Sequence, residues 1–241
     1  MNSMPAAIKF YIFLLLPVLF LGFIGIPGNS SASTDKEKSG TITANSVTAL
    51  YNKLELDKLQ LSPKAFSRAL DGAARLKAKG ALQNDSIISI IDFTLPSYKK
   101  RLFIINLNSG ELLFNTFVSH GRNSGMAMAT RFSNKLNSLQ SSLGFYVTAD
   151  TYNGQHGYSL RLQGMEKGIN DNAYNRGIVM HSAGYVDESL IQSQGYIGRS
   201  WGCPAVPVSL HKEIIETIRN GSCLFIYSSN KYYTSRSRMV G

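Results

Sequence analysis

Cys203 and His181 are the two side chains of this sequence that could together carry out nucleophilic catalysis. Cys203 lies in GRSWGCPAVP, a run of small and turn-forming residues that predicts a tight bend. His181 lies near the end of GIVMHS, an apolar stretch typical of a short strand. A thiolate attacks carbonyl carbon, and it needs a base or a positive charge nearby to form at neutral pH. The two residues are therefore a candidate nucleophile and base, whose proximity in space the sequence leaves open.

The scaffold that must position these residues is predicted to be mainly β. Short segments rich in β-branched and aromatic residues alternate with turns rich in Gly, Asn and Ser. The predicted strands are residues 87–92, 101–107, 111–118, 144–150, 158–164, 177–182 and 223–228. Asn108, Ser109 and Gly110 separate the second strand from the third and predict a hairpin.

Two amphipathic helices flank the predicted strands. Ser62 and Pro63 provide an N-cap and a first-turn proline, and apolar residues recur at helical spacing as far as Gly80. Residues 209–220 repeat this pattern before Gly221, and residues 43–60 have irregular helical character. The predicted fold class is mainly β with flanking helices.

The N-terminal sequence and the net charge limit the classes of protein to which the chain could belong. Residues 1–32 combine Lys9, a long apolar run and a small-x-small site at Ser30 and Ala32, which predicts a signal peptide cleaved after Ala32. An uncleaved N-terminal anchor in contact with a membrane is the alternative, although Pro17 weakens a continuous span. The net charge of +10 favours an anionic partner, and export leaves a cell-wall polymer or a membrane surface rather than nucleic acid.

These observations divide the chain into four segments. The predicted segments are a signal peptide or anchor over 1–32, a linker and helical segment over 33–84, a catalytic domain over 85–228 and a basic tail over 229–241. The tail is polar, so we expect it to fray. With 44% hydrophobic residues in 241, the chain has ample apolar material for a core.

Several blocks of this sequence resemble a known family. His181, followed by Ser200-Trp201-Gly202-Cys203, is similar to the His…Ser-x-Gly-Cys signature of L,D-transpeptidases. The longer blocks are DFTLPSYKKRLFIINL, LLFNTFVSHGRNSG, FSNKLNSLQSSLGFYVT, GYSLRLQGMEKGINDNAYNRGIVMHSAGYV and GRSWGCPAVP. Together they resemble the murein L,D-transpeptidase catalytic-domain family, a branch of the wider YkuD-like group. This resemblance implies a YkuD-like β-sandwich or mixed-sheet catalytic domain preceded by a helical segment.

The resemblance also implies roles for individual residues. Cys203 matches the family's nucleophile and His181 its general base. The amides of Gly202 and Cys203 match the oxyanion site, and Ser200 matches the serine of the motif, which would shape the loop. The candidates for substrate binding are Arg199, Arg122, Arg176, His120 and His156. A guanidinium binds a carboxylate bidentately, although each arginine also fits a structural ion pair. Where many YkuD-like enzymes have an arginine shortly after the cysteine, this chain has Pro204 and Ala205.

The activity implied by the resemblance is peptidoglycan L,D-transpeptidation. Cys203 would attack the third residue of a stem tetrapeptide and release D-alanine, and a side-chain amine of a neighbouring stem would then take the acyl group to give a 3-3 crosslink. Water in place of the amine would make the protein an L,D-carboxypeptidase. The reaction needs no cofactor and no metal. The implied partner is a peptidoglycan stem peptide, in the periplasm or cell envelope of a bacterium.

Other interpretations remain open at this level. A Cys203–Cys223 disulfide would remove the nucleophile, although Cys223 lies in an apolar predicted strand. Another cell-wall amide hydrolase would use the same Cys–His pair, and a non-catalytic wall-binding module would keep the fold without activity. A papain-like or NlpC-like peptidase is disfavoured because its cysteine precedes its histidine along the chain.

Overall fold

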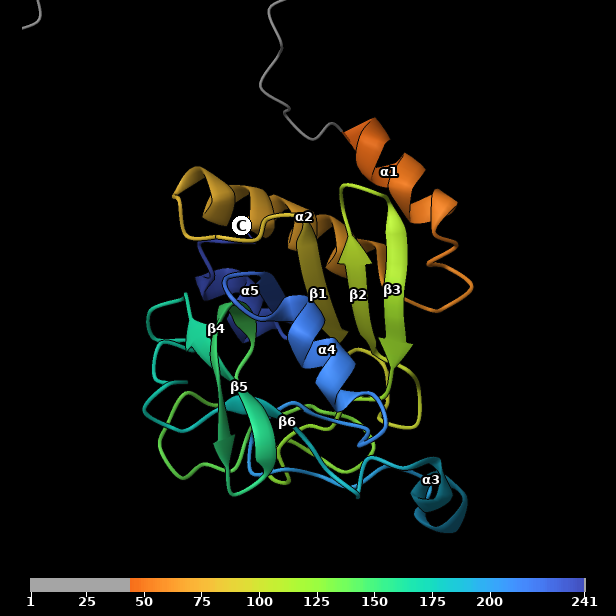
Figure 1. The fold of residues 1–241 in the computed structure, drawn as a ribbon, viewed down its shortest axis with the longest axis vertical. Helices are drawn as coiled ribbons and strands as arrows, with labels where there is room; N and C mark the ends of the chain where they lie inside the picture. The colour runs from red at the N-terminus through yellow and green to blue at the C-terminus, as the bar shows by residue number, and fades with distance from the viewer. Residues whose placement is uncertain (1–43, 241) are drawn as a thin grey trace, which may run out of the picture. The chain divides into compact units, whose positions relative to one another are not determined.

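The computed structural model describes residues 44–240, and its centre is a mixed sheet of eight strands (Figure 1). The strands are β1 (Ile87–Asp92), β2 (Leu102–Asn106), β3 (Glu111–Thr116), β4 (Gly144–Gly154), β5 (Gly157–Gly164), β6 (Val179–Ser182), β7 (Ala205–Val206) and β8 (Cys223–Tyr227). Their order in the sheet is β3-β2-β1-β8-β4-β5-β6-β7. β1 pairs with β8 and β6 with β7 in parallel, and the remaining pairs are antiparallel. The predicted class, mainly β with flanking helices, is confirmed.

Within residues 44–240, five helices accompany the sheet. They are α1 (Ala44–Lys53), α2 (Pro63–Ala78), α3 (Glu188–Gln194), α4 (His211–Ile218) and α5 (Lys231–Arg236). The predicted cap of α2 is confirmed, since the Ser62 hydroxyl accepts a hydrogen bond from the Ala65 amide at 3.3 Å. No helix within the described part of the chain has the length and apolar character needed to cross a bilayer.

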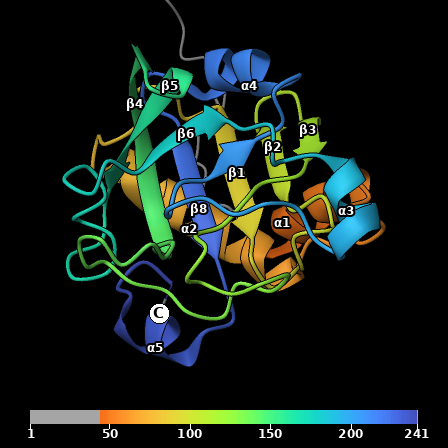
Figure 2. The ribbon, with the colours of Figure 1, turned by 90° about the horizontal axis from the view of Figure 1, so that it is seen from below.

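Helices cover both faces of the central strands. α2 packs on β1 and β8, and α4 packs on β1, β5 and β6, so β1 is buried along its whole length (Figure 2). Gly72 lets α2 approach β4, because a Cβ there would lie 2.0 Å from the Phe145 ring. Full burial of a Phe or Ile side chain stabilises the fold by roughly 1.5–3 kcal/mol, so the side chains buried between these layers stabilise the fold.

The helical segment before β1 belongs to the same core. Tyr51, Leu56, Leu61 and Phe66 are buried in one apolar cluster with the strands. The Tyr51 hydroxyl donates to the Leu61 carbonyl at 2.5 Å, and its ring lies 5.6 Å from that of Phe66. The described residues therefore form one compact unit. The predicted signal peptide, the cleavage site and the first part of the linker lie outside the described residues.

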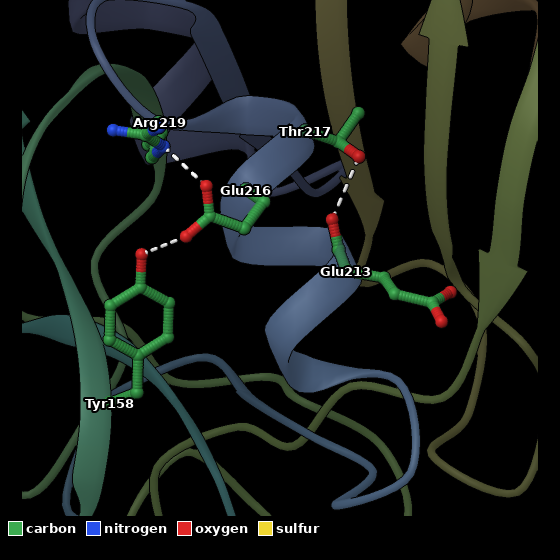
Figure 3. A network of polar contacts seen from close by, with 5 residues as sticks. All are labelled: Tyr158, Glu213, Glu216, Thr217 and Arg219. Carbon is green, nitrogen blue, oxygen red and sulfur yellow. Dashed lines mark hydrogen bonds and ion pairs between the residues drawn. The ribbon is translucent and has the colours of Figure 1, made fainter.

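A surface network holds α4 against β5 (Figure 3). Glu216 accepts a hydrogen bond from the Tyr158 hydroxyl and pairs with Arg219 at 2.7 Å. Thr217 donates its hydroxyl to the carbonyl of Glu213 at 2.7 Å. Exposed ion pairs contribute only about 0–1 kcal/mol, so the network orients α4 while its buried isoleucines anchor it.

The C-terminal tail is folded, and the prediction that it frays is wrong. α5 follows its N-cap Asn230, whose side chain accepts from the Tyr233 amide at 3.1 Å. The Tyr233 hydroxyl donates to buried Glu166 at 3.1 Å, and the Ser237 hydroxyl donates to the other oxygen of that carboxylate. The polar composition of the tail does not predict these contacts, because the carboxylate that accepts them lies far away in sequence.

Candidate active site

Cys203 lies on a short loop between α3 and β7 that Ser200 braces from within. The Ser200 hydroxyl donates to the Cys203 carbonyl at 2.6 Å and accepts from the Gly202 amide at 3.0 Å. Hydroxyl-to-backbone bonds of this kind stabilise tight turns. Ser200 thus has the loop-shaping contacts that the sequence predicts for it.

Gly202 cannot be replaced without distorting this loop. Its φ is +130°, a conformation that residues with a Cβ rarely adopt. A Cβ would also lie 2.8 Å from the Gln140 carbonyl oxygen and 3.3 Å from Nη2 of Arg176. The backbone immediately before the candidate nucleophile is therefore set by both torsion and packing.

A second segment, residues 119–122, runs beside the Cys203 loop and is hydrogen-bonded to it. Gly121 and Ser200 form a parallel bridge, and the Arg122 amide donates to the Ser200 carbonyl at 2.7 Å. Further on, the Ser119 amide donates to the Ala205 carbonyl at 2.8 Å, and the Ala205 amide donates to the Ser119 hydroxyl at 3.1 Å. The loop is therefore held at both ends by residues distant in sequence.

His181 lies on β6, the strand that pairs with β7 just after the cysteine. His181 is in register with Ala205, and Cys203 precedes Ala205 by two residues on the parallel neighbour. Nδ1 of His181 lies 2.8 Å from the Ser182 carbonyl, which can only accept, so Nδ1 carries the proton and Nε2 keeps its lone pair. Burial lowers the pKa of His181, with a smaller contribution from His156, so the imidazole is neutral at neutral pH and suits a base.

The Cys203 thiol is half-buried and protonated at rest. Its sulfur lies 3.6 Å from the Gly177 carbonyl. Burial raises the thiol pKa, and the Val179 backbone and the charge of Arg176 offset this in part. Forming the thiolate therefore requires a proton acceptor, and β6 presents His181 beside this loop.

Arg176 is committed to a neighbouring loop instead of standing free for substrate. Nη1 donates to the Ser133 carbonyl at 2.7 Å and to the Ser142 hydroxyl at 2.5 Å. Nη2 donates to the Ser138 hydroxyl at 3.1 Å and to the Gln140 carbonyl at 2.6 Å. With both terminal nitrogens engaged, Arg176 serves residues 133–142 as a clamp and acts on Cys203 through its charge.

His120 is fully buried, so its side chain is not available for the direct substrate contact predicted from the sequence. Its side chain is 0% exposed, and Nη2 of buried Arg101 lies 2.7 Å from its Nδ1. Nε2 lies 3.3 Å from the Gly125 carbonyl. Burial and the Arg101 charge lower the pKa of His120 to about 3. The ring is therefore neutral, and its contacts stabilise the segment beside the Cys203 loop.

The other predicted substrate-binding residues lie at or near the surface. Arg122 is exposed, directly after the bridge between Gly121 and Ser200. Arg199 is half-buried and donates to the Gly125 carbonyl at 3.2 Å. His156 is exposed, and its ring stacks on that of His181 with centroids 4.3 Å apart. The structure therefore brings His156 to the candidate base, and substrate contact by these three residues stays a prediction.

Only one of the two amides expected to form an oxyanion site is without a protein partner. The Gly202 amide donates to the Ser200 hydroxyl, so it is engaged. The Cys203 amide has no hydrogen-bond acceptor among residues 44–240. A fixed and unpaired N–H next to the nucleophile is the kind of donor that stabilises an oxyanion.

Both cysteines are free thiols, which removes the disulfide alternative for this structure. Cys223 is buried in β8, opposite Ile88 and Val147 on the neighbouring strands. Burial raises its pKa to about 12, so it behaves as a small apolar residue.

Three further residues around the loop have contacts or exposure that point to a role, although none was predicted for them. Trp201 is 73% exposed although it lies directly between Ser200 and Gly202. Trp201 is the single tryptophan of the chain and lies within the motif, and this is the sequence feature that could have indicated a role for it. The Tyr185 carbonyl accepts from the Gly198 amide at 2.7 Å, and burial, followed by the charge of a Cys203 thiolate, raises the pKa of Tyr185 to about 12. Arg101 orients His120, and no local pattern predicts that contact.

Comparison with solved structures gives partial matches to L,D-transpeptidases. An L,D-transpeptidase from Mycobacterium smegmatis is 13% identical, with 59% of each chain covered and a TM-score of 0.37. An L,D-transpeptidase from Stackebrandtia nassauensis is 13% identical over 77% of this chain and 78% of the other, with a TM-score of 0.36. The helical cell shape determining protein Pgp2 from Campylobacter jejuni is 14% identical over 73% of this chain and 57% of its own, with a TM-score of 0.43. The chain thus spans about three fifths of the first of these structures.

Sequence comparison with protein families is more informative. No curated protein matches the chain significantly. The YkuD_2 family, described as the L,D-transpeptidase catalytic domain, matches residues 57–227. The match includes Cys203, His181 and all eight strands of the sheet. The chain therefore belongs to the L,D-transpeptidase catalytic domain family.

Proposed function

We propose that this protein is a peptidoglycan L,D-transpeptidase in which Cys203 is the nucleophile and His181 the general base. The family match over residues 57–227 carries the proposal, because it includes both side chains. The register of β6 and β7 supports it, since this register sets the Cys203 loop beside the strand of His181.

In the first half of the proposed reaction, the stem tetrapeptide acylates the enzyme. Nε2 of His181 takes the thiol proton, and the sulfur of Cys203 attacks the carbonyl carbon of the third residue. The charge of Arg176 favours the thiolate, and the Cys203 amide is the donor we assign to the tetrahedral oxyanion. The C–N bond breaks, the imidazolium protonates the departing amine, and D-alanine leaves behind a thioester.

In the second half, the acyl group passes to an amine. The side-chain nitrogen of a neighbouring stem attacks the thioester carbonyl, the C–S bond breaks, and His181 receives the proton that the new amide loses. That proton returns to sulfur, which restores the thiol. The product is a 3-3 crosslink, and water in place of the amine gives a free tripeptide instead.

The proposal places the protein outside the cytoplasm. Its substrate would be the peptide stems of peptidoglycan, and the predicted signal peptide would export the chain to the periplasm or cell envelope. Neither proposed half-reaction uses a cofactor or a metal, because His181 and Cys203 handle every proton and bond.

Mass spectrometry of the protein after incubation with disaccharide-tetrapeptides tests the proposal. We expect an adduct equal to the tetrapeptide minus D-alanine on the wild type and on Cys223→Ala, and none on Cys203→Ala. Crosslinked dimers in the same mixture would indicate transfer, and free tripeptide would indicate carboxypeptidase activity. Wall binding that persists in Cys203→Ala, with no adduct or product from the wild type, would support a non-catalytic binding module and contradict the proposal.

A further inference from the structure

A basic hollow lies between residues 130–143 and the C-terminal tail. Its volume is about 590 Å³, and Arg131 and Lys135 line it together with Tyr232 and Asn230 of the tail. The lining contains no aspartate or glutamate. The hollow is large enough for part of a peptide, and its charge selects for an anionic one.

The two cations of this hollow have no partner in the described part of the chain. The side chains of Arg131 and Lys135 are exposed and make no hydrogen bond or ion pair there. The carboxylate of Asp171, just beyond the lining residue Ile169, accepts from the Asn134 side chain at 2.7 Å and from the Gly168 amide at 2.8 Å. Both positive charges are therefore available to carboxylates of a ligand.

Gln140 lies between the hollow and the Cys203 loop. Ser133 and Gln140 line the hollow, and Arg176 binds the carbonyl oxygens of both, at 2.7 Å and 2.6 Å. The same Gln140 oxygen lies 2.8 Å from the Cβ position of Gly202. A ligand in the hollow would therefore lie next to the backbone that carries Cys203.

The tail forms the side of the hollow opposite residues 130–143, and holding it there costs free energy because a carboxylate is buried. Glu166, which anchors the tail, is buried and accepts from the Phe145 amide at 2.9 Å as well as from Tyr233 and Ser237. No cation among residues 44–240 forms an ion pair with it, and burial raises its pKa. A buried carboxylate without a counter-charge is unfavourable. Here its hydrogen bonds hold Asn230 and Tyr232 at the rim of the hollow, and the Tyr232 side chain is 65% exposed.

We infer that this hollow binds the acceptor stem peptide of the second half-reaction, with carboxylates of the stem on Arg131 and Lys135. The inference rests on the proposed function, which requires a second stem whose amine reaches the thioester on Cys203. A stem held by its carboxylates on Arg131 and Lys135 would extend its side chain past Gln140 toward the Cys203 loop. The nearby positive charges also disfavour protonation of the attacking amine, which must be neutral to react.

The test separates acceptor binding from acylation. Thioester formation is measured by mass spectrometry with donor alone, and the partition of that thioester between crosslinked dimer and free tripeptide is then measured against acceptor concentration. The variant is Arg131→Gln with Lys135→Gln. The control is Lys64→Gln with Lys79→Gln, which removes two exposed positive charges on and just after α2.

We expect thioester formation in the Arg131/Lys135 variant to stay within about twofold of wild type. The acceptor concentration for half-maximal transfer should rise about tenfold, since 1.4 kcal/mol of lost binding corresponds to that factor. An unchanged acceptor dependence, an equal shift in the control, or a parallel loss of thioester formation would overturn the inference alone. A wild-type protein that forms no thioester would instead overturn the proposed function, and this inference with it.

Discussion

The two cysteines of this chain occupy opposite surroundings. Cys203 is half-buried on a loop held by serine hydroxyls, a glycine with positive φ and a nearby guanidinium. Cys223 is buried within β8, between β1 and β4. Both thiols have a raised pKa, so burial alone does not distinguish a nucleophile from a core residue. The two thiols differ in their neighbours: His181 lies on the strand next to the Cys203 loop, and the charge of Arg176 favours the Cys203 thiolate, whereas burial alone accounts for the raised pKa of Cys223.

The largest expected difference between the two thiols is in their alkylation by iodoacetamide. Cys203 should react in the native protein, whereas Cys223 should react only after the sheet opens. If that opening is global, with a free energy of at least 5 kcal/mol, the rates differ by more than about a thousandfold. Peptide mapping after timed labelling measures both rates. Comparable labelling of both cysteines in folded protein would contradict this assignment.

Replacing Gly202 should remove the backbone geometry that makes Cys203 different. Gly202→Ala places a methyl group 2.8 Å from the Gln140 carbonyl at φ +130°. Misplacement of a reacting group by about 1 Å lowers rates by roughly a hundredfold, so we expect a loss in kcat/KM of that order. Gly184→Ala is the matched control, because a Cβ there meets nothing within 4 Å. Equal activity of the two variants would show that the loop tolerates the change.

Removing the Arg176 charge should leave the Cys203 thiolate without this electrostatic stabilisation, as at Cys223. Burial raises the pKa of the Cys203 thiol and the guanidinium offsets part of this, so Arg176→Gln should raise that pKa further and slow alkylation at pH 8 by up to about tenfold. Arg176→Lys keeps the charge and loses bonds to residues 133–142. Alkylation rates against pH give the thiol pKa, and circular dichroism checks the fold. A thiol pKa that falls in Arg176→Gln would refute the electrostatic role.

The smallest expected effect concerns the stacked histidines. His156 lowers the pKa of His181, so His156→Phe, which keeps a stacked ring without the charge, should move the acid limb of kcat/KM to higher pH. We expect a decrease of a few fold near pH 6 and no change at pH 8, where His181 is neutral in both proteins. His211→Phe on α4 is the control. An acid limb that moves to lower pH would contradict the direction of this coupling.

Local sequence patterns were sufficient to predict most elements of the fold. The seven strands expected from apolar and β-branched runs are present, and α2 begins after its Ser62 cap. β7, with two residues, is too short to show a period, and α3 contains no buried residue that would mark an apolar face. Contacts with segments that are distant in sequence therefore determine β7 and α3.

The sequence by itself determined the family, the mainly β scaffold and the candidate pair Cys203 and His181, because motifs and periodicities are written in adjacent residues. Tertiary structure alone decided that Arg101 buries His120, that Arg176 clamps residues 133–142, and that Glu166 holds the tail. Each of these contacts joins residues far apart along the chain. Whether a polar side chain faces substrate or the interior depends on such contacts, since a buried donor must find its acceptor wherever the fold supplies one.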